Sequence, residues 1–340
     1  MATNLRPIGI YHEHQDWFRP LFAELDRRGT RYERIDARQH AYDLGSNDAA
    51  AYSVVINRMS PSAYLRGAGH AILYTQNYLA HLEQLGVRVI NGTRAFRLET
   101  SKAQQLTLLR SLGLPYPPAR VINHGSEAPA AADGLRFPVV VKANIGGSGA
   151  GIVRFDTPED LARASVEGRL DLGLDQTALV QEYIPARGGH ITRVEVLDGQ
   201  FIYAINVHTT GDTFNLCPAD ICQTNDGVAL ARGACPADAP KNNLRVEAFT
   251  PPGEVIADVE RIAAAAGIEI GGVEYIVDDR DGQRYYYDIN ALSNFVADAP
   301  RVVGFDPFAR LADWLEREQR GAEPLPVAVP TGLVEGATRW

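Results

Sequence analysis

A predicted β-hairpin at residues 273–290 constrains the fold of this sequence more than any other feature. Two segments rich in Val, Ile and Tyr flank the dipeptide Asp281-Gly282, which is typical of a tight turn. Symmetric pairing about this turn places Glu274 opposite Asp288, and Asn290 points to the same face of the sheet. Facing carboxylates repel each other unless a cation neutralises them, so the hairpin predicts an oxygen-ligand site for Mg²⁺. A solvated polar face of the sheet is the alternative.

A glycine-rich segment follows another predicted strand, at residues 137–143. The segment reads IGGSGAG and contains Gly146, Gly147, Ser148 and Gly149. Glycine lets backbone N–H groups approach phosphate oxygens closely, but no Lys-Ser/Thr pair follows, so this is not a Walker A loop. Lys142 follows three valines directly before the loop and is placed to reach an anionic ligand there. A glycine turn between two strands is the alternative.

A third candidate segment, Gln181-Glu182-Tyr183, lies at the end of the apolar strand predicted at 178–184. Backbone groups at such a strand end can contact the edge of an adenine ring. An ordinary strand end is the alternative.

The segment up to residue 95 alternates strands with helices. Strands are predicted at 7–11, 31–36, 53–58 and 87–91, which indicates a wound α/β unit with a parallel sheet. No Gly-x-Gly-x-x-Gly follows the first strand, which argues against a dinucleotide fold of the usual kind. A single helix is predicted over 94–112, and strands dominate the residues that follow it.

The chain has 33 basic and 42 acidic residues and a net charge of −9. Such an acidic balance excludes broad attraction to nucleic acid or to anionic membranes. No apolar run approaches the roughly 20 residues of a membrane span, and the N-terminus lacks the pattern of a secretion signal, so a cytoplasmic location is predicted. The three cysteines form no CxxC pair, which fits a reducing compartment.

Seven features occur in an order that is typical of one superfamily. They are Lys102, Lys142 before the glycine loop, Glu182-Tyr183, Arg193, Glu274, Asp288 and Asn290. With them the chain resembles the ATP-grasp superfamily, and most closely the RimK-like carboxylate–amine ligases. The resemblance implies an α/β chain with the ATP-grasp fold, α+β in its catalytic part. It implies an N-terminal wound α/β domain at 1–95, two α+β subdomains that clasp ATP at 96–183 and 184–325, and a tail at 326–340.

The resemblance also implies a role for each candidate residue. Lys102 and Lys142 bind the phosphates of ATP, and Arg193 with Lys142 acts in catalysis by stabilising the transferred phosphoryl group. Glu274, Asp288 and Asn290 hold two Mg²⁺ (or Mn²⁺) ions. The other residues implied in ATP binding are Gly146, Gly147, Ser148, Gly149, Gln181, Glu182, Tyr183, His190 and Asn215.

The chain departs from the family pattern in several places. The metal-binding pair is Glu274 then Asp288 in place of Asp then Glu, which preserves the total charge. Where family members have Asp-Ile-Arg, this chain reads Ile191-Thr192-Arg193, so His190 or Thr192 would replace the ribose-binding acid. The Arg that often precedes the position of Asn215 by two residues is absent, which leaves the substrates open.

Three further residues are candidates for contact with a ligand. Arg58 lies at the end of a predicted strand, where it either packs or binds a substrate carboxylate, and Asn294 is a second substrate candidate. Tyr286 is predicted to share the face of Asp288.

The resemblance implies an ATP-dependent ligase that forms an amide through an acylphosphate, with an amino acid or peptide as substrate. The alternatives are an ATP-grasp small-molecule kinase of the inositol-phosphate type and a non-catalytic ATP-binding regulatory protein. The negative net charge, with no Lys/Arg cluster outside the nucleotide motifs, argues against a polyanionic kinase substrate. The predicted partners are small-molecule or peptide carboxylates and amines, and a homo-oligomer is compatible with the fold.

Overall fold

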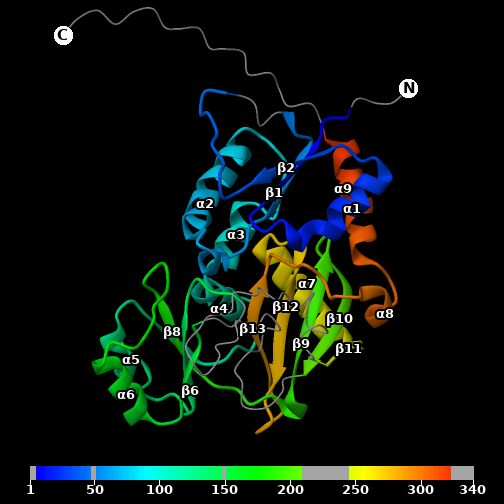
Figure 1. Cartoon of the computed structure of the whole chain (residues 1–340). Helices are drawn as coiled ribbons and strands as arrows, with labels where there is room; N and C mark the ends of the chain where they lie inside the picture. Colours follow the sequence, from blue (N-terminus) through cyan, green and yellow to red (C-terminus); the bar gives the residue numbers. More distant parts are fainter. Residues whose placement is uncertain (1–4, 47–50, 148–150, 209–244, 323–340) are drawn as a thin grey trace, which may run out of the picture.

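The structure of the protein is a computed structural model that describes residues 5–46, 51–147, 151–208 and 245–322. These residues form three β-sheets with helices packed around them (Figure 1). No helix within the described residues is both long enough and apolar enough to cross a lipid bilayer.

The first sheet contains four parallel strands in the order β2-β1-β3-β4. They are β1 (Ile8–His12), β2 (Tyr32–Asp36), β3 (Val54–Arg58) and β4 (Val89–Ile90). Helix α1 (Arg19–Arg28) connects β1 to β2, and α2 (Gly69–Gln84) connects β3 to β4. The wound parallel arrangement predicted for this part of the chain is confirmed.

The C-terminal helix α9 (Pro307–Gly321) returns to the first sheet and packs beside α1 (Figure 1). Trp314 of α9 shares one hydrophobic core with Leu21 of α1. Arg28 Nη1 donates to Asp313 Oδ1 at 2.5 Å across the same contact. The two ends of the described chain therefore build this layer together.

The second sheet is antiparallel, in the order β5-β8-β6-β7. Its strands are β5 (Ala119–Ile122), β6 (Val139–Ala143), β7 (Val153–Phe155) and β8 (Ala178–Glu182), and one core joins them to the helices α5 (Ala128–Ala131) and α6 (Pro158–Val166). Thr157 caps α6 by accepting the N–H of Asp160 at 3.2 Å.

The third sheet has the order β11-β10-β9-β12-β13 and is also antiparallel. Its strands are β9 (His190–Leu197), β10 (Gln200–His208), β11 (Val246–Phe249), β12 (Ile270–Val277) and β13 (Arg284–Asn290). Helix α7 (Gly253–Ala266) covers one face, where its Val255 joins Val194 and Val273 in a core. The opposite face is therefore the one available to a ligand.

Short helical turns complete the described elements. They are η1 (Asp16–Phe18), η3 (Ala63–Arg66), η4 (Gly125–Glu127), η5 (Arg187–Gly189) and the helix α8 (Ala299–Val303). η1 and η3 follow the carboxyl ends of β1 and β3, the edge of an open α/β sheet at which ligands bind.

The single helix predicted over 94–112 is wrong. The structure contains α3 (Thr93–Glu99) and α4 (Lys102–Ser111). Ser101 between them has an extended backbone, and its Oγ accepts the N–H of Gln104 at 3.3 Å, which satisfies a free donor in the first turn of α4. The Ser101 hydroxyl also donates to Asn144 Oδ1 at 3.1 Å. This break makes Lys102 the first residue of α4.

The predicted pairing of Glu274 with Asp288 is confirmed, but the register changes directly beside it. Tyr275 pairs with Tyr286, so Tyr287 is an extra residue, as in a β-bulge. The prediction that Tyr286 shares the face of Asp288 is wrong, because the bulge turns Tyr286 into the core under α7. Tyr287 faces the cleft described below instead.

Candidate active site

A cleft is lined by the second and third sheets and by the turns that follow β1 and β3. Most of the candidate residues predicted from the sequence line this cleft. They are Lys102, Lys142, Gly146, Gly147, Gln181, Glu182, Tyr183, Arg193, Glu274, Asp288, Asn290 and Asn294. Residues that are far apart in the sequence therefore meet at one place.

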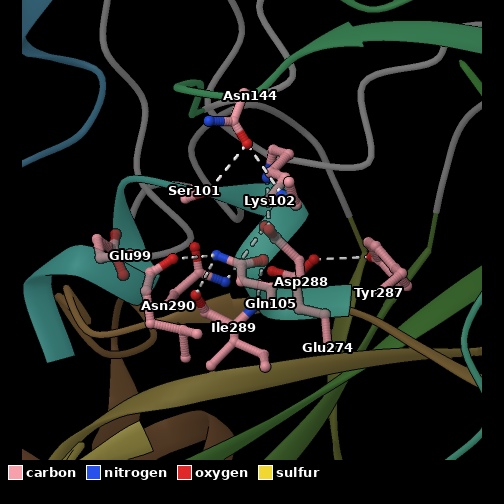
Figure 2. Close-up of polar contacts among 12 residues, drawn as sticks. Glu99, Ser101, Lys102, Gln105, Asn144, Glu274, Tyr287, Asp288, Ile289 and Asn290 are labelled. Carbon is pink, nitrogen blue, oxygen red and sulfur yellow. Dashed lines mark hydrogen bonds and ion pairs between the residues drawn. The ribbon is translucent and has the colours of Figure 1, made fainter. Parts of the chain in front are cut away.

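Lys102 and Asp288 form an ion pair across this cleft (Figure 2). Lys102 Nζ donates to Asp288 Oδ1 at 2.5 Å. Burial acts to lower the pKa of Lys102, but the charge and hydrogen bond of Asp288, together with the charges of Glu274 and Glu99, leave that pKa above its usual value. Burial likewise acts to raise the pKa of Asp288, but the charge and hydrogen bond of Lys102, together with Lys142 and Asn290, bring that pKa below its usual value. Both groups are therefore charged.

Helix α4 is fixed against β13 by the side chain of Gln105. Its Nε2 donates to the Ile289 carbonyl at 2.9 Å, and its Oε1 accepts the Ile289 N–H at 3.2 Å. Figure 2 shows Gln105 between the helix and the strand, one turn along from Lys102. This clamp holds Lys102 and Asp288 at a fixed separation.

Lys142 on β6 is 5% exposed and lines the cleft. Burial, followed by the nearby charge of Lys102, lowers its pKa to about 7. Among the described residues its ammonium group has no hydrogen-bond partner. An anionic ligand would therefore supply the hydrogen-bond partner that the described residues do not.

Arg193 on β9 contacts two buried carboxylates. Its Nε donates to Glu195 Oε1 at 2.6 Å, and its Nη1 donates to Glu274 Oε1 at 3.0 Å. The Tyr287 hydroxyl donates to the other oxygen of Glu274 at 2.7 Å. Burial raises the pKa of Glu274, although Arg193 opposes this.

The donor set at the end of the hairpin fits a hard divalent cation. Glu274, Asp288 and Asn290 offer only oxygen ligands, because the Asn290 amide group donates through Nδ2 to Asp288 Oδ2 at 3.3 Å and leaves its carbonyl oxygen. Each carboxylate oxygen that already accepts one hydrogen bond keeps a second lone pair for a metal. Two carboxylates beside phosphate-binding groups match the way in which proteins hold Mg²⁺.

The glycine loop begins at the cleft and approaches the turn after β3. A Cβ atom added to Gly147 would lie 3.0 Å from Ser62 Cβ, closer than side-chain carbons ordinarily approach. Glycine at this position therefore permits the contact with Ser62. Ser148 and Gly149 lie outside the described residues.

The end of β8 supplies the segment predicted to contact adenine. Gln181 is buried, and its Oε1 has no hydrogen-bond partner among the described residues. Glu182 Oε1 accepts the N–H of Arg136 at 3.0 Å, and the Arg154 guanidinium lies 4.8 Å above the Tyr183 ring. A buried acceptor without a partner is unfavourable, so a ligand amino group would stabilise it.

His190 and Thr192 do not line the cleft. Thr192 pairs with Tyr275 and donates its hydroxyl to Asn206 Oδ1 at 2.8 Å, on the face of the sheet that α7 covers. His190 lies at the start of β9, with its ring 5.2 Å from that of His208. Replacement of the ribose-binding acid by either residue stays a prediction.

Arg58 and Asn294 are close in space, although only Asn294 lines the cleft. Arg58 is buried, and its Nη2 donates to the carbonyl of Ser293. Arg58 thus supports the loop that carries Asn294. Asn215 and the tail at 326–340 lie outside the described residues.

Sequence reasoning missed Glu99 and Glu195. Glu99 ends α3, lines the cleft and accepts the backbone N–H groups of Ala291 and Leu292, the loop directly after the hairpin. Burial raises its pKa to about 7. In the sequence both residues look like ordinary polar positions in a helix or strand. Only the structure, in which Glu99 is 5% and Glu195 is 1% exposed, identifies them as buried carboxylates near the site.

Comparison with known proteins decides the superfamily. The family model of the RimK-like ATP-grasp domain matches residues 99–216, which carry Lys102, Lys142 and Arg193. Residues 99–216 form an ATP-grasp domain of the RimK-like family. The resemblance seen in the order of the motifs is therefore confirmed.

Curated relatives of this ATP-grasp chain are enzymes. A D-alanine–D-alanine ligase from Alkalilimnicola ehrlichii is 24% identical over 306 residues, which cover 85% of this chain and 84% of the relative. The carbamoyl phosphate synthase large chain of Archaeoglobus fulgidus is 26% identical over 278 residues, or 78% of this chain. That match covers only 24% of the synthase chain.

Solved structures share the fold of this ATP-grasp chain. The ATP-grasp ligase PsnB, complexed with a phosphomimetic variant of its minimal precursor, Mg and ADP, aligns with a TM-score of 0.65 and 21% identity, over 93% of this chain and 100% of PsnB. The D-cycloserine synthetase DcsG aligns with a TM-score of 0.63 and 19% identity, over 92% and 99% of the two chains. The predicted ATP-grasp fold, with its mixture of sheets and helices, is confirmed.

Proposed function

We propose that this protein is an ATP-dependent ligase that joins a carboxylate to an amine and releases ADP and phosphate. The convergence of Lys102, Lys142 and Arg193 on the oxygen ligands of one hairpin carries this proposal. ATP-grasp ligases use ATP and a divalent metal ion, and the D-alanine–D-alanine ligase named above supports the same class of reaction.

Each group in the cleft has a place in such a reaction. Glu274, Asp288 and Asn290 would hold Mg²⁺ or Mn²⁺, which neutralises phosphate charge when bound. Lys102 and Lys142 would bind the phosphates, and the glycine loop would cover them. Gln181, Glu182 and Tyr183 would contact the adenine ring.

The reaction has two steps. A substrate carboxylate oxygen attacks the γ-phosphorus of ATP, so that a C–O–P bond forms and ADP leaves. The amine nitrogen then attacks the acyl carbon, phosphate leaves and the nitrogen loses a proton, which gives the amide. Arg193 and Lys142 would stabilise the negative charge of the transferred group, which requires positioning and electrostatics more than acid–base catalysis.

The substrates are expected to be amino acids or peptides. A D-alanine–D-alanine ligase and a PsnB complex with a precursor peptide are among the similar proteins, which supports both substrate classes. In this chain Asn294, Trp17 and Ser62 line the side of the cleft nearest the first sheet, where a substrate would enter. Assembly into a homo-oligomer stays a prediction.

The test is incubation of the protein with ATP, Mg²⁺ and pools of amino acids, peptides and small acids. ADP and phosphate are measured by coupled assays, and products by mass spectrometry. ADP, phosphate and a product with the mass of two substrates less one water support the ligase. A phosphorylated product without an amide would identify a kinase, and AMP with pyrophosphate would exclude the acylphosphate route.

A further inference from the structure

Two charged residues interrupt an otherwise apolar face of β9. Ile191 and Leu197 on this face belong to a hydrophobic core, but Arg193 and Glu195 between them are 4% and 1% exposed. Burial of a charge is strongly unfavourable unless it is paired. The pair Arg193–Glu195, with 2.6 Å between Nε and Oε1, meets this condition.

The backbone of β12 makes room for this pair. Gly272 pairs in register with Glu195, and the Arg193 side chain lies across it. A Cβ atom at Gly272 would lie 2.8 Å from both Nε and Nη2 of Arg193. The direction of the guanidinium group is therefore set by Glu195 on one side and by Gly272 beneath it.

Glu274 is a second carboxylate partner of the same guanidinium group, 3.0 Å from Nη1. One positive charge thus faces two buried carboxylates, which leaves one negative charge uncompensated within this trio. Glu274 is also the residue proposed above to bind a divalent cation. A guanidinium and a metal ion on one carboxylate share its single negative charge and repel each other, even though each oxygen has a lone pair for both.

We propose that Glu195 is a positioning residue that balances the charge of Arg193 and so leaves the charge of Glu274 to the metal. This inference rests on the proposed function, because it gives Glu274 and Arg193 their roles there. With Glu195 present, Arg193 keeps a carboxylate partner after a metal binds Glu274, and its guanidinium stays directed into the cleft. Without Glu195, the guanidinium group closes on Glu274 and competes with the cation.

The first test measures Mn²⁺ binding in the presence of ADP, from the electron paramagnetic resonance signal of free Mn²⁺. The Glu195→Gln variant keeps the size of the side chain and an acceptor for Arg193 Nε but removes the charge. We expect it to bind Mn²⁺ roughly 10-fold more weakly, the lower end of the usual effect of groups around a metal ligand, because Glu195 acts on Glu274 only through Arg193. Asp278→Asn is the matched control, since Asp278 is a fully buried carboxylate paired with Arg280 that does not line the cleft.

The second test asks whether Glu195 acts through Arg193. In an Arg193→Met background the competing cation is gone, so Glu195→Gln should no longer weaken Mn²⁺ binding. An unchanged Mn²⁺ affinity in Glu195→Gln, or an equal loss with and without Arg193, would overturn the inference. If removal of any buried carboxylate charge weakened Mn²⁺ binding through a loss of folding, the effect would appear in both backgrounds and also in the Asp278→Asn control.

These measurements separate the inference from the proposed function. If the wild-type protein binds Mn²⁺ with ADP but forms no amide, the proposed ligase function is refuted. The Mn²⁺ affinities of the two variants then still decide the role of Glu195. Wild-type protein that binds no Mn²⁺ would contradict the inference whatever the ligase assay shows. Where ligation is observed, we expect Glu195→Gln to lower kcat and raise the Mg²⁺ concentration needed for half-maximal rate, with KM for ATP little changed.

Discussion

Lys102 Nζ lies 2.5 Å from Asp288 Oδ1, although 186 positions separate the two residues in the chain. The break between α3 and α4 directs Lys102 into the cleft, and the hairpin presents Asp288 from the opposite side. A phosphate-binding candidate and a metal-binding candidate thus neutralise each other. Binding of ATP with a metal ion is expected to separate them, since each then gains a stronger partner of opposite charge.

Asp288→Asn should abolish turnover while the fold stays intact. The amide cannot supply the negative charge that a divalent cation requires, and Lys102 loses its ion-pair partner. We expect the rate of ATP-dependent ligation to fall by at least about 100-fold, as when one electrostatic group is removed from a reacting site. Phosphate release measures the rate, circular dichroism checks the fold, and exposed Asp133→Asn is the control. A rate near wild type would show that the metal site is assigned wrongly.

Nucleotide binding should take up a proton through Lys142. Its pKa of about 7 in the free protein means that the amine is mostly neutral at about pH 8, and a nearby triphosphate favours the charged form. The affinity for ADP should therefore decrease as the pH rises above about 7. Calorimetry at about pH 8 in two buffers of different ionisation enthalpy measures the uptake. Uptake that persists in Lys142→Met would assign the proton to another group.

Gly272→Ala should impair the enzyme through Arg193. The added methyl group would lie 2.8 Å from Nε and Nη2 of Arg193, so the guanidinium must shift against its buried carboxylate partners, at a cost of about 1 kcal/mol of unfolding free energy, the lower end for overpacking. We expect urea denaturation to show this loss and the ligation rate to fall with it, because Arg193 must move. Gly253→Ala is the matched control, since a Cβ atom there meets no atom within 4 Å. Equal behaviour of the two variants would contradict the close packing of Arg193 on Gly272.

Glu99 should make the stability of the ligand-free protein depend on pH. Burial raises its pKa from 4.5 to about 7, so the folded state holds a proton that the unfolded state releases in this range. Its contribution to stability is complete below pH 4.5 and is lost as the pH rises through about 7.

The Glu99→Gln variant tests this dependence. Because it does not ionise, its unfolding free energy should decrease less than that of wild type between about pH 5 and about pH 7.5. Urea denaturation at the two pH values measures the difference. The unfolding free energy of the control Glu127→Gln, at an exposed position, should change with pH as that of wild type does. If Glu99→Gln also shows the wild-type change, titration of the buried Glu99 carboxyl group is ruled out.

The sequence predicted those parts of the site that depend on local patterns. A turn dipeptide between two alternating strands determines that Glu274 faces Asp288, because strand pairing has a period of two. Thr157 before Pro158 predicts the start of α6, since a hydroxyl followed by proline satisfies the first turn of a helix. The order of the motifs along the chain identified the superfamily.

Only the tertiary structure decided which residues complete the site. The bulge directs Tyr287, in place of Tyr286, toward the cleft, and it depends on the packing of β13 under α7. The helix break at Ser101 depends on the hydrogen bond of this residue to Asn144. The burial of Glu99 and Glu195 follows from elements far away in the sequence. Periodicity and capping act over a few residues and can be recognised in the chain. Contacts between distant segments depend on how whole layers pack, so the partners of Lys102 and Arg193 appear only in the folded protein.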